Sequence, residues 1–485
     1  MKRIITKDLR RSIILAIMYA AVFLSAASLR AQTLPFLNTL FTDNMVLQRD
    51  VLDKVWGWTT PGAVVKVVIN NQTNSVTAGA DGSWQVTVGP FSAGGGAYTM
   101  TVNGPQSVTL TNVVMGDVIL CSGQSNMERQ LGPRPPQSDI LNYLAEAAAA
   151  TNSNIRELYV PEVAAVQPQM LIPSGGGNWT ICNSNNVLNF TAVGYETAKY
   201  ITQATNVPIG LLFSAWGGTA IQPWTDAQTA MQCADDSQTI FDLAGQTNAS
   251  NGTISQIYNQ MIAPLTNFSI RAVVWYQGEA NAGSPQQYSE LLPQLMNSWR
   301  GVFGRPSLPF IICQLANYST AQTLPVETGS YAEIRESQLN TVRNDTNSRL
   351  AVLIDVGRPN SADTNTVVDI HQPDKEQVGQ RCAWALLDVA YGQSLVSQSP
   401  VFSGATVSGT NVVCTFTNIG GGLTAGWFVQ LSPVVPTNGP LTGFAVAGAN
   451  GTYYSANCNH LCEQPGQGFQ PERAESALCA LWLGQ

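Results

Sequence analysis

The sequence has very few histidines and few charged residues. Only His371 and His460 are histidine among 485 residues, and charged residues make up 11% of the chain. Two histidines are too few for a metal site built from several imidazoles, and the low charge argues against intrinsic disorder. A net charge of -8 argues against a nucleic-acid partner, because phosphate binding needs a basic surface. A mechanism that needs a histidine base therefore has almost no choice of residue.

Recognisable cysteine motifs are also absent. The chain has nine cysteines, and none of them has a CxxC or a zinc-ligand spacing. The sequence therefore predicts no metal and no cofactor. An odd number leaves at least one cysteine unpaired, and sequence spacing does not determine which of the others form disulfides.

Long apolar runs are missing everywhere except near the N-terminus. Five Lys or Arg residues within the first eleven positions precede an apolar run from Ile13 to Leu24 and then small residues. This order is typical of a secretory signal peptide over residues 1–31, with cleavage after Ala31 or Ala27. The run is short for a membrane span, although an uncleaved anchor is the alternative. We expect a secreted or periplasmic protein that leaves the membrane after cleavage.

Two β-rich regions flank a region of mixed character. Residues 32–112 alternate short β-type runs with turn signals, which predicts a small antiparallel β-sandwich with a hairpin turn at Asp81-Gly82. Residues 113–400 alternate apolar strands with helical stretches such as 287–299 and 374–390. That alternation predicts an α/β fold with a parallel sheet, whose ligands bind at the carboxyl ends of the strands. Residues 401–456 return to β character.

Four loops that follow apolar strands or open a helix carry residues suited to ester chemistry, through either a side chain or a backbone N–H. Ser125 lies between small and amide residues in a strand-end turn, which suits a nucleophile, although many such turns are only turns. Gly217 and Gly218 follow another strand and offer unshielded N–H groups. Gln277 supplies an amide donor in a third loop that also contains Glu279 and Asn281. His371 is the candidate base, with Asp369 as its orienting carboxylate.

Together these motifs resemble a known family. The segments CSGQSNM, SAWGGT, WYQGEAN and DIH, in this order, are similar to the sialate O-acetylesterase family of the SGNH hydrolase superfamily. The resemblance runs from about residue 36 to about residue 456 and includes FTDNMVLQR and GRPSLPFIICQLANY. It implies a three-layer, flavodoxin-like parallel sheet and acetyl-ester hydrolysis.

The resemblance also implies a role for each matched residue. Ser125 matches the nucleophile, and its backbone N–H is one donor of the oxyanion hole. Gly218, or Gly217, matches the second donor, and Gln277 matches the side-chain donor. His371 matches the base. Asp369 stands two residues before it, where the superfamily has a spacing of three, and Gln372 replaces a common proline.

The sequence leaves the substrate open. The leading prediction is an O-acetylated sugar such as sialic acid, and Arg335 is a candidate contact for its carboxylate, alongside Glu279 and Asn281. Acetylated xylan or another plant polysaccharide is an alternative. A second alternative is a non-catalytic carbohydrate-binding protein, because aromatic rings stack on sugars and the chain has eleven tryptophans. The sequence does not indicate an oligomeric state.

The last residues depart from the family pattern. Relatives continue with β-type sequence after a stretch that Gly451–Ala456 matches, and here the match stops. When the tail is back-translated with permitted codons, shifting the reading frame by one nucleotide allows a continuation that follows the family pattern. We therefore hypothesise that residues 457–485 are a frameshifted, non-native tail, and a divergent native tail is the alternative.

Overall fold

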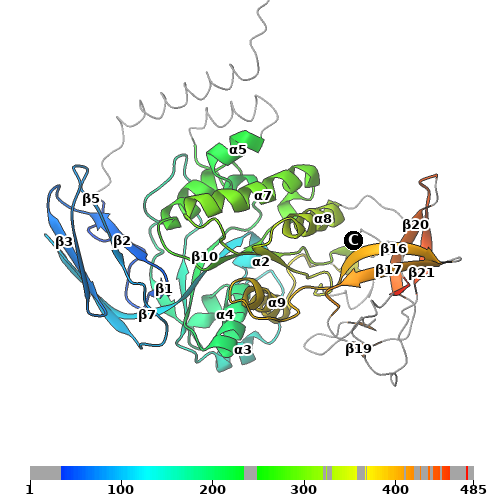
Figure 1. The fold of residues 1–485 in the computed structure, drawn as a ribbon, viewed down its shortest axis with the longest axis horizontal. Helices are drawn as coiled ribbons and strands as arrows, with labels where there is room; N and C mark the ends of the chain where they lie inside the picture. Colours follow the sequence, from blue (N-terminus) through cyan, green and yellow to red (C-terminus); the bar gives the residue numbers. More distant parts are fainter. Residues whose placement is uncertain are drawn as a thin grey trace, which may run out of the picture.

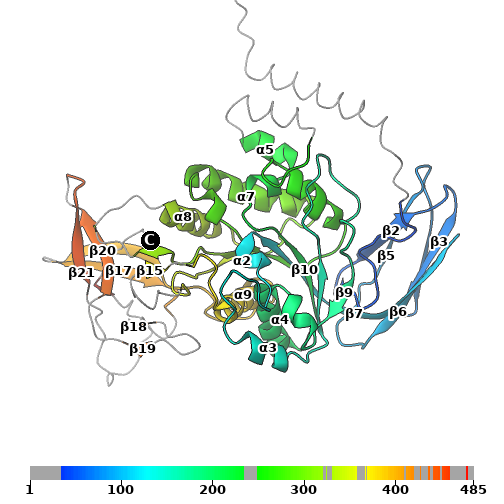
Figure 2. The same ribbon diagram turned by 180° about the vertical axis from the view of Figure 1, so that it is seen from behind.

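A computed structural model describes most of the chain beyond residue 33. The described residues are 34–233, 248–320, 324, 330–357, 366–367, 369–408, 411–419, 426–427, 435–436, 441–447, 450–458 and 477–478. In the ribbon, N-terminal strands lie at one end, a layered α/β region lies in the middle, and C-terminal strands lie at the other end (Figures 1 and 2). The predicted signal peptide, residues 1–31, lies outside the described residues.

The middle region is built on a largely parallel sheet. Its strands, in spatial order, are β14 (Ser348–Ala351), β12 (Phe310–Cys313), β11 (Ala272–Tyr276), β7 (Ser107–Gly123), β10 (Ile209–Ala215), β8 (Ile155–Tyr159) and β9 (Trp179–Ile181). All neighbouring pairs are parallel except β8 and β9. From β10 to β14 the order is the flavodoxin-like one, in which the chain reverses direction of travel beside β7. The predicted α/β class is therefore confirmed, and the sheet as a whole is mixed because β9 and β6 join it as antiparallel strands.

Helices cover both faces of this sheet. One layer contains α5 (Ala227–Cys233), α7 (Pro285–Val302) and α8 (Ser330–Arg343), and the other contains α3 (Tyr143–Ala149), α4 (Ala192–Thr205) and α9 (Lys375–Val389) (Figure 1). The helices predicted over 287–299 and 374–390 correspond to α7 and α9. Asp374 caps α9, since its side chain accepts a hydrogen bond from the Gln377 N–H.

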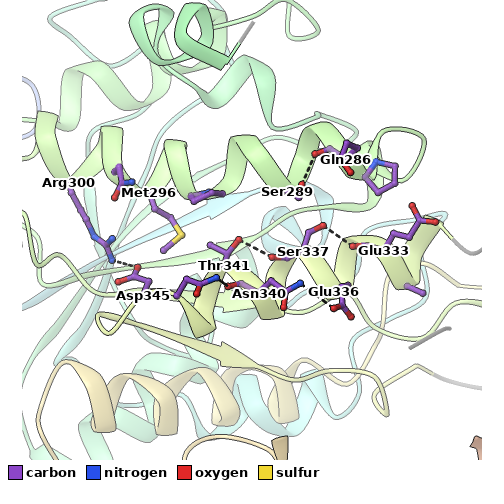
Figure 3. A pocket seen from close by; sticks show the side chains of 15 residues that line it. Gln286, Ser289, Met296, Arg300, Glu333, Glu336, Ser337, Asn340, Thr341 and Asp345 are labelled. Atoms are coloured by element: carbon purple, nitrogen blue, oxygen red, sulfur yellow. Dashed lines mark hydrogen bonds and ion pairs between the residues drawn. The ribbon is translucent and has the colours of Figure 1, made fainter. Parts of the chain in front are cut away.

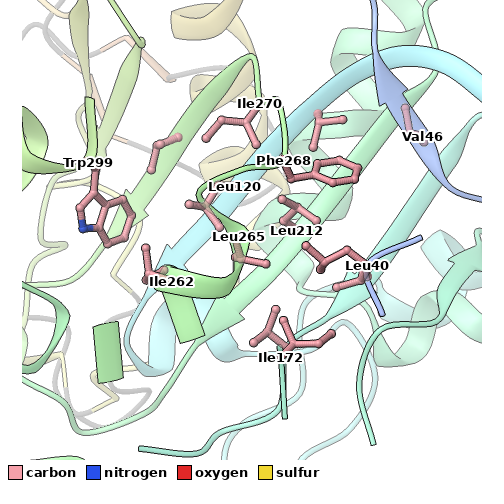
Figure 4. Packing of buried hydrophobic residues seen from close by; sticks show 14 of the residues in the cluster. Leu40, Val46, Leu120, Ile172, Leu212, Ile262, Leu265, Phe268, Ile270 and Trp299 are labelled. Atoms are coloured by element: carbon pink, nitrogen blue, oxygen red, sulfur yellow. The ribbon is translucent and has the colours of Figure 1, made fainter. Parts of the chain in front are cut away.

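Alternate residues of each buried strand enter different cores. On β11, Val273 and Trp275 pack into the core beneath α7, while Val274 and Tyr276 pack into the core beside α4 and α9. This period of two explains why the strands are apolar throughout. The first core is a cluster of aliphatic and aromatic side chains, part of which is shown in Figure 4, and it includes the fully buried Trp299 of α7.

The N-terminal region is joined to the sheet by a shared strand. β2 (Asp53–Trp58) pairs with β5 (Ser83–Val88), and β3 (Val64–Ile69) lies between β4 (Gln72–Thr77) and β6 (Tyr98–Asn103). The first half of β7 is antiparallel to β6, whereas its second half is parallel to β10 and β11, and β1 (Val46–Gln48) joins it in parallel. The antiparallel pairings agree with prediction.

The predicted hairpin at Asp81-Gly82 is wrong. A turn forms there, and Gly82 has a φ of +80°, but the flanking strands β4 and β5 pair with β3 and β2 rather than with each other. The residues Asp81 and Gly82 therefore predicted the turn correctly. The pairing of β4 and β5 with other strands depends on which faces of those strands are buried.

The C-terminal strands form small antiparallel groups. They are β16 (Val401–Ser408), β17 (Asn411–Thr417), β18 (Gly426–Trp427), β19 (Val435–Pro436), β20 (Leu441–Ala447), β21 (Tyr453–Cys458) and β22 (Ala477–Leu478), and a further pair joins β13 (Ser319–Thr320) to β15 (Thr366–Val367). Most of the hypothesised frameshifted tail lies outside the described residues, so that hypothesis stays a prediction. Among the described helices, none is long and apolar enough to cross a membrane.

Candidate active site

The end of β7 presents a single serine to solvent. Within Cys121–Arg129 every residue except Ser125 is buried, and Ser125 begins the one-turn helix α2 (Ser125–Glu128). Gly123 makes this turn possible, because its φ is +136° and an added Cβ would lie 2.0 Å from the carbonyl oxygen of Tyr276. The N–H of Gln124 donates to the same oxygen at 2.9 Å. The neighbouring strand therefore holds the turn that exposes Ser125.

The loop after β10 lies directly against this turn. An added Cβ on Gly217 would lie 3.3 Å from the Cβ of Ser125, and the Trp216 N–H donates to the Gly123 carbonyl at 3.1 Å. Gly218 has a φ of +72°, which favours glycine. Within the part of the chain that the structure describes, the backbone N–H groups of Ser125 and Gly218 donate to no protein acceptor. The structure thus brings the serine and the two glycines together.

Gln277 lies in the same place but is engaged with the protein. Its side chain is fully buried, and Nε2 donates to Asn281 Oδ1 at 2.7 Å and to Gln124 Oε1 at 3.1 Å. Nε2 also lies 3.2 Å from the Thr219 carbonyl, and Oε1 has no partner among the described residues. These bonds tie the loops after β7, β10 and β11 to one another. Its role as an oxyanion donor stays a prediction.

Asn126, which the sequence reasoning missed, connects the serine turn to the histidine loop. Its Nδ2 donates to Glu279 Oε1 at 2.6 Å and to the Ile370 carbonyl at 3.0 Å. Its Oδ1 accepts from Lys375 Nζ at 2.6 Å, and both Asn126 and Lys375 are buried. Burial raises the pKa of Glu279, and the hydrogen bond from Asn126 opposes this increase. One amide next to Ser125 therefore joins three loops, and the only signal in the sequence was an amide within the serine motif.

His371 is partly buried and close to Asp369. Asp369 Oδ1 accepts the backbone N–H of His371 at 2.8 Å and lies 3.7 Å from its Nδ1. Burial lowers the pKa of His371, and the positive charge of Lys375 lowers it further, while Asp369 opposes both. His371 is therefore neutral around pH 7, as a general base must be. Catalytic hydrogen bonds are often long before substrate binds, so 3.7 Å is compatible with an orienting role for Asp369.

Gln372 replaces the proline expected from the resemblance. Its side chain is buried, and Nε2 donates to the Asn317 carbonyl at 3.2 Å. The amide attaches the histidine loop to the segment after β12, so the substitution leaves His371 anchored.

Comparison with known proteins identifies the family of this chain. Residues 115–387 match the family model of the sialic acid-specific acetylesterases, which are carbohydrate esterases. The chain belongs to this family. The resemblance predicted from the four motifs is confirmed.

Relatives of this esterase family cover most of the chain. The human sialate O-acetylesterase is 29% identical over 391 residues, which span 74% of this chain and 72% of the relative. The mouse sialate O-acetylesterase is 29% identical over 429 residues, or 77% of each chain. The crystal structure of a carbohydrate acetylesterase from Xanthomonas citri is 32% identical, has a TM-score of 0.74, and covers 92% of this chain and 91% of that one. The mixed α/β fold is therefore that of a carbohydrate esterase.

Two predicted substrate contacts of this esterase lie in supporting positions. Asn281 is 2% exposed, its Oδ1 accepts from Gln277 and from the Ile221 N–H, and its Nδ2 donates to Gln222. Arg335 is buried on α8, and its Nη1 donates to the Ala316 carbonyl at 3.4 Å. Burial lowers the pKa of Arg335 to about 10. Neither has a hydrogen bond to Ser125 or His371, and both roles stay predictions.

Among the described residues, a metal-ligand cluster does not mark this site. Within the described ranges no group of three or more His, Cys, Asp or Glu side chains could hold a metal ion. A cavity of about 700 Å³ lies in the outer helical layer between α7 and α8 (Figure 3). Its lining includes Arg300, Glu336 and Asp345 and none of the predicted site residues. The candidate active site is therefore identified by the convergence of loops, as expected at the reversal point of such a sheet.

Proposed function

We propose that the protein is a secreted serine esterase that removes acetyl groups from O-acetylated sugars. The observation that carries this proposal is the arrangement around Ser125. The partly exposed Ser125 stands beside N–H groups of Ser125 and Gly218 that have no acceptor among the described residues, and Asn126 attaches the same turn to the loop of His371. A nucleophile, an oxyanion site and a base are the three parts that acyl transfer needs.

In the proposed first step, His371 removes the proton of the Ser125 hydroxyl. The oxygen then forms a bond to the acetyl carbonyl carbon, and the negative charge on the carbonyl oxygen is stabilised by the N–H groups of Ser125 and Gly218. Because Nδ1 of His371 faces Asp369, Nε2 is the nitrogen that acts as the base. The C–O bond to the sugar breaks, and the sugar oxygen takes the proton from His371.

In the second step, water hydrolyses the acetyl-serine. His371 removes a proton from water, the resulting hydroxide attacks the same carbonyl, and Ser125 leaves with the proton, releasing acetate. Gln277 would serve as a third oxyanion donor if the substrate oxygen replaced one of its present acceptors. Asp369 stabilises the protonated imidazole in both steps through its negative charge.

The acetylated sugar is the open part of the proposal. Sialic acid is supported by the family, and Arg335 is the candidate contact for its carboxylate, which requires that Nη2, buried in this structure, become accessible when substrate binds. An acetylated plant polysaccharide such as xylan needs no cation. Comparing wild type and Arg335→Ala on acetylated sialic acid and acetylated xylan separates the two: loss on sialic acid alone would support the carboxylate contact.

The esterase proposal is tested with p-nitrophenyl acetate. Residues 32–485 should hydrolyse it, and Ser125→Ala and His371→Ala should each lower kcat by about a thousandfold or more, because these residues act as a unit. Glu290→Gln, an exposed change on α7, is the control and should retain the parent rate. A folded parent without activity would instead support the non-catalytic carbohydrate-binding alternative, and activity that survives Ser125→Ala would exclude this nucleophile.

A further inference from the structure

A second cavity begins beside the serine turn. It has a volume of about 560 Å³ and lies at the carboxyl ends of β8 and β10, where Glu128, Arg134, Tyr159, Glu162, Asn189 and Phe213 contribute to its lining. Glu128 follows Ser125 by three residues on α2, and an added Cβ on Gly217 would lie 2.4 Å from its Oε2. Glu128 therefore lies between the oxyanion loop and the cavity, which places the cavity next to the candidate ester site.

The cavity offers an accessible aromatic ring. Tyr159 is 39% exposed, and its ring packs against that of Phe213 with 5.3 Å between the centroids. Phe213 is buried, so the tyrosine ring rests on a rigid base and keeps part of its surface open. Such a ring can cover the apolar C–H face of a sugar while its hydroxyl remains in water.

Around this ring the lining is rich in hydrogen-bond acceptors and poor in free positive charge. Arg134 is the only Lys or Arg in the lining, and it forms an ion pair with Glu128. Burial raises the pKa of Glu162 to about 7, and the nearby negative charge of Glu128 adds to this effect. The negative charge of an acidic sugar would be repelled by the carboxylates of Glu128 and Glu162. The hydroxyls of a neutral sugar would instead donate hydrogen bonds to the same carboxyl oxygens.

We propose that this cavity is a subsite for an uncharged sugar residue of the acetylated glycan, held by stacking on Tyr159 and by hydroxyl bonds to Glu128 and Glu162. The inference rests on the proposed esterase function. It names the substrate class of that site as neutral, hydroxyl-rich sugar. The proposed sialate contact, Arg335, lies on α8 and is not part of this lining.

The test compares an acetylated xylo-oligosaccharide, O-acetylated sialic acid and p-nitrophenyl acetate. Tyr159→Ala and Glu162→Gln should each lower the ratio of kcat/KM on the oligosaccharide to kcat/KM on p-nitrophenyl acetate about tenfold, mainly through KM. Glu290→Gln and Tyr453→Ala, the same changes at exposed positions elsewhere, should leave that ratio unchanged. Circular dichroism and thermal melting establish that each variant is folded.

Each outcome decides the matter. A selective fall on the neutral oligosaccharide supports the subsite. The proposal is overturned if kcat/KM is unchanged or falls equally on the oligosaccharide and on p-nitrophenyl acetate, because their ratio then stays the same. It is also overturned if kcat/KM falls selectively on acetylated sialic acid. If the wild-type protein hydrolyses none of the three esters, the esterase proposal itself has failed. In that case, binding of unacetylated xylo-oligosaccharide by wild type and by Tyr159→Ala tests the cavity alone, and equal affinities would exclude it.

Discussion

Lys375 lies in an environment that is unusual for an amine. Its side chain is completely buried, its Nζ donates to Asn126 Oδ1, and it lies 5.2 Å from the centre of the Tyr276 ring. Burial lowers the pKa of Lys375 to about 7, although the negative charge of Glu279 opposes the change. A buried amine is costly, so this position suggests a role in the site rather than in stability alone.

Replacing Lys375 should change the pH dependence of the esterase. His371 must be neutral to accept a proton, so kcat/KM rises with pH through the pKa of His371, which lies below its ordinary value. At that pH Lys375 is protonated, and its charge helps to lower the pKa of His371. In Lys375→Met that pKa should rise, and the acidic limb of the profile should move to higher pH.

The charge can be separated from the hydrogen bond. Lys375→Arg keeps the positive charge, so its acidic limb should stay near that of the wild type even if its maximal rate falls. Arg129, Arg134 and Asp369 also influence the pKa of His371 and are unchanged in both variants. A Lys375→Met profile that loses height without moving along the pH axis would contradict the electrostatic role.

At the scale of elements, the turn between β7 and α2 depends on a close approach of two strands. Gly123 combines a positive φ with a position where a side chain would collide with the Tyr276 carbonyl. A change of side-chain rotamer cannot relieve the unfavourable φ or the collision, because both involve backbone atoms. The turn that exposes Ser125 therefore requires glycine at position 123.

Gly123→Ala should therefore be strongly destabilising. We expect the free energy of unfolding to fall by about 3 kcal/mol and esterase activity to fall with it, since Ser125 would shift. Gly301→Ala is the matched control. It lies in α7, is exposed, and has open space around an added Cβ, so it should stabilise by about 0.5–1 kcal/mol. Chemical denaturation of both variants measures these changes, and equal effects would refute the argument.

The elements differ in how far local sequence determines them. Residues 287–299 and 374–390 were predicted as helices because their pattern is local, and α7 and α9 form there. The pairing of β4 and β5 was mispredicted because strand pairing is a long-range choice. The turn residues Asp81 and Gly82 specify a reversal of the chain but not its partner strand.

Over the whole molecule, the N-terminal strands and the α/β region share one apolar core. Phe41 packs against Trp56 of β2 and against Phe268, which also contacts Trp179 of β9. These side chains belong to the same buried cluster as Leu212 and Trp275 of the central sheet. With β7 crossing both regions, the two are one structural unit.

A chain that begins at residue 113 should consequently fail to fold. It would lack β1 and the antiparallel partners of β7, and it would leave apolar surface of the shared core exposed. We expect it to be insoluble, whereas residues 32–485 should show a single calorimetric transition for the joined regions. A soluble truncated protein that retains activity would demonstrate two independent domains.

The sequence by itself predicted the candidate site residues and the local elements. Strand-end motifs located Ser125, Gly217, Gly218 and Gln277, and the scarcity of histidine singled out His371, because these signals reside in residue type and short spacing. Only the tertiary structure decided the rest. Asn126 donates to the Ile370 carbonyl 244 residues away, Lys375 lies close enough to lower the pKa of His371, and Glu128 and Tyr159 line one cavity. Those relations follow from which strands lie side by side, and burial then sets the strength of each charge.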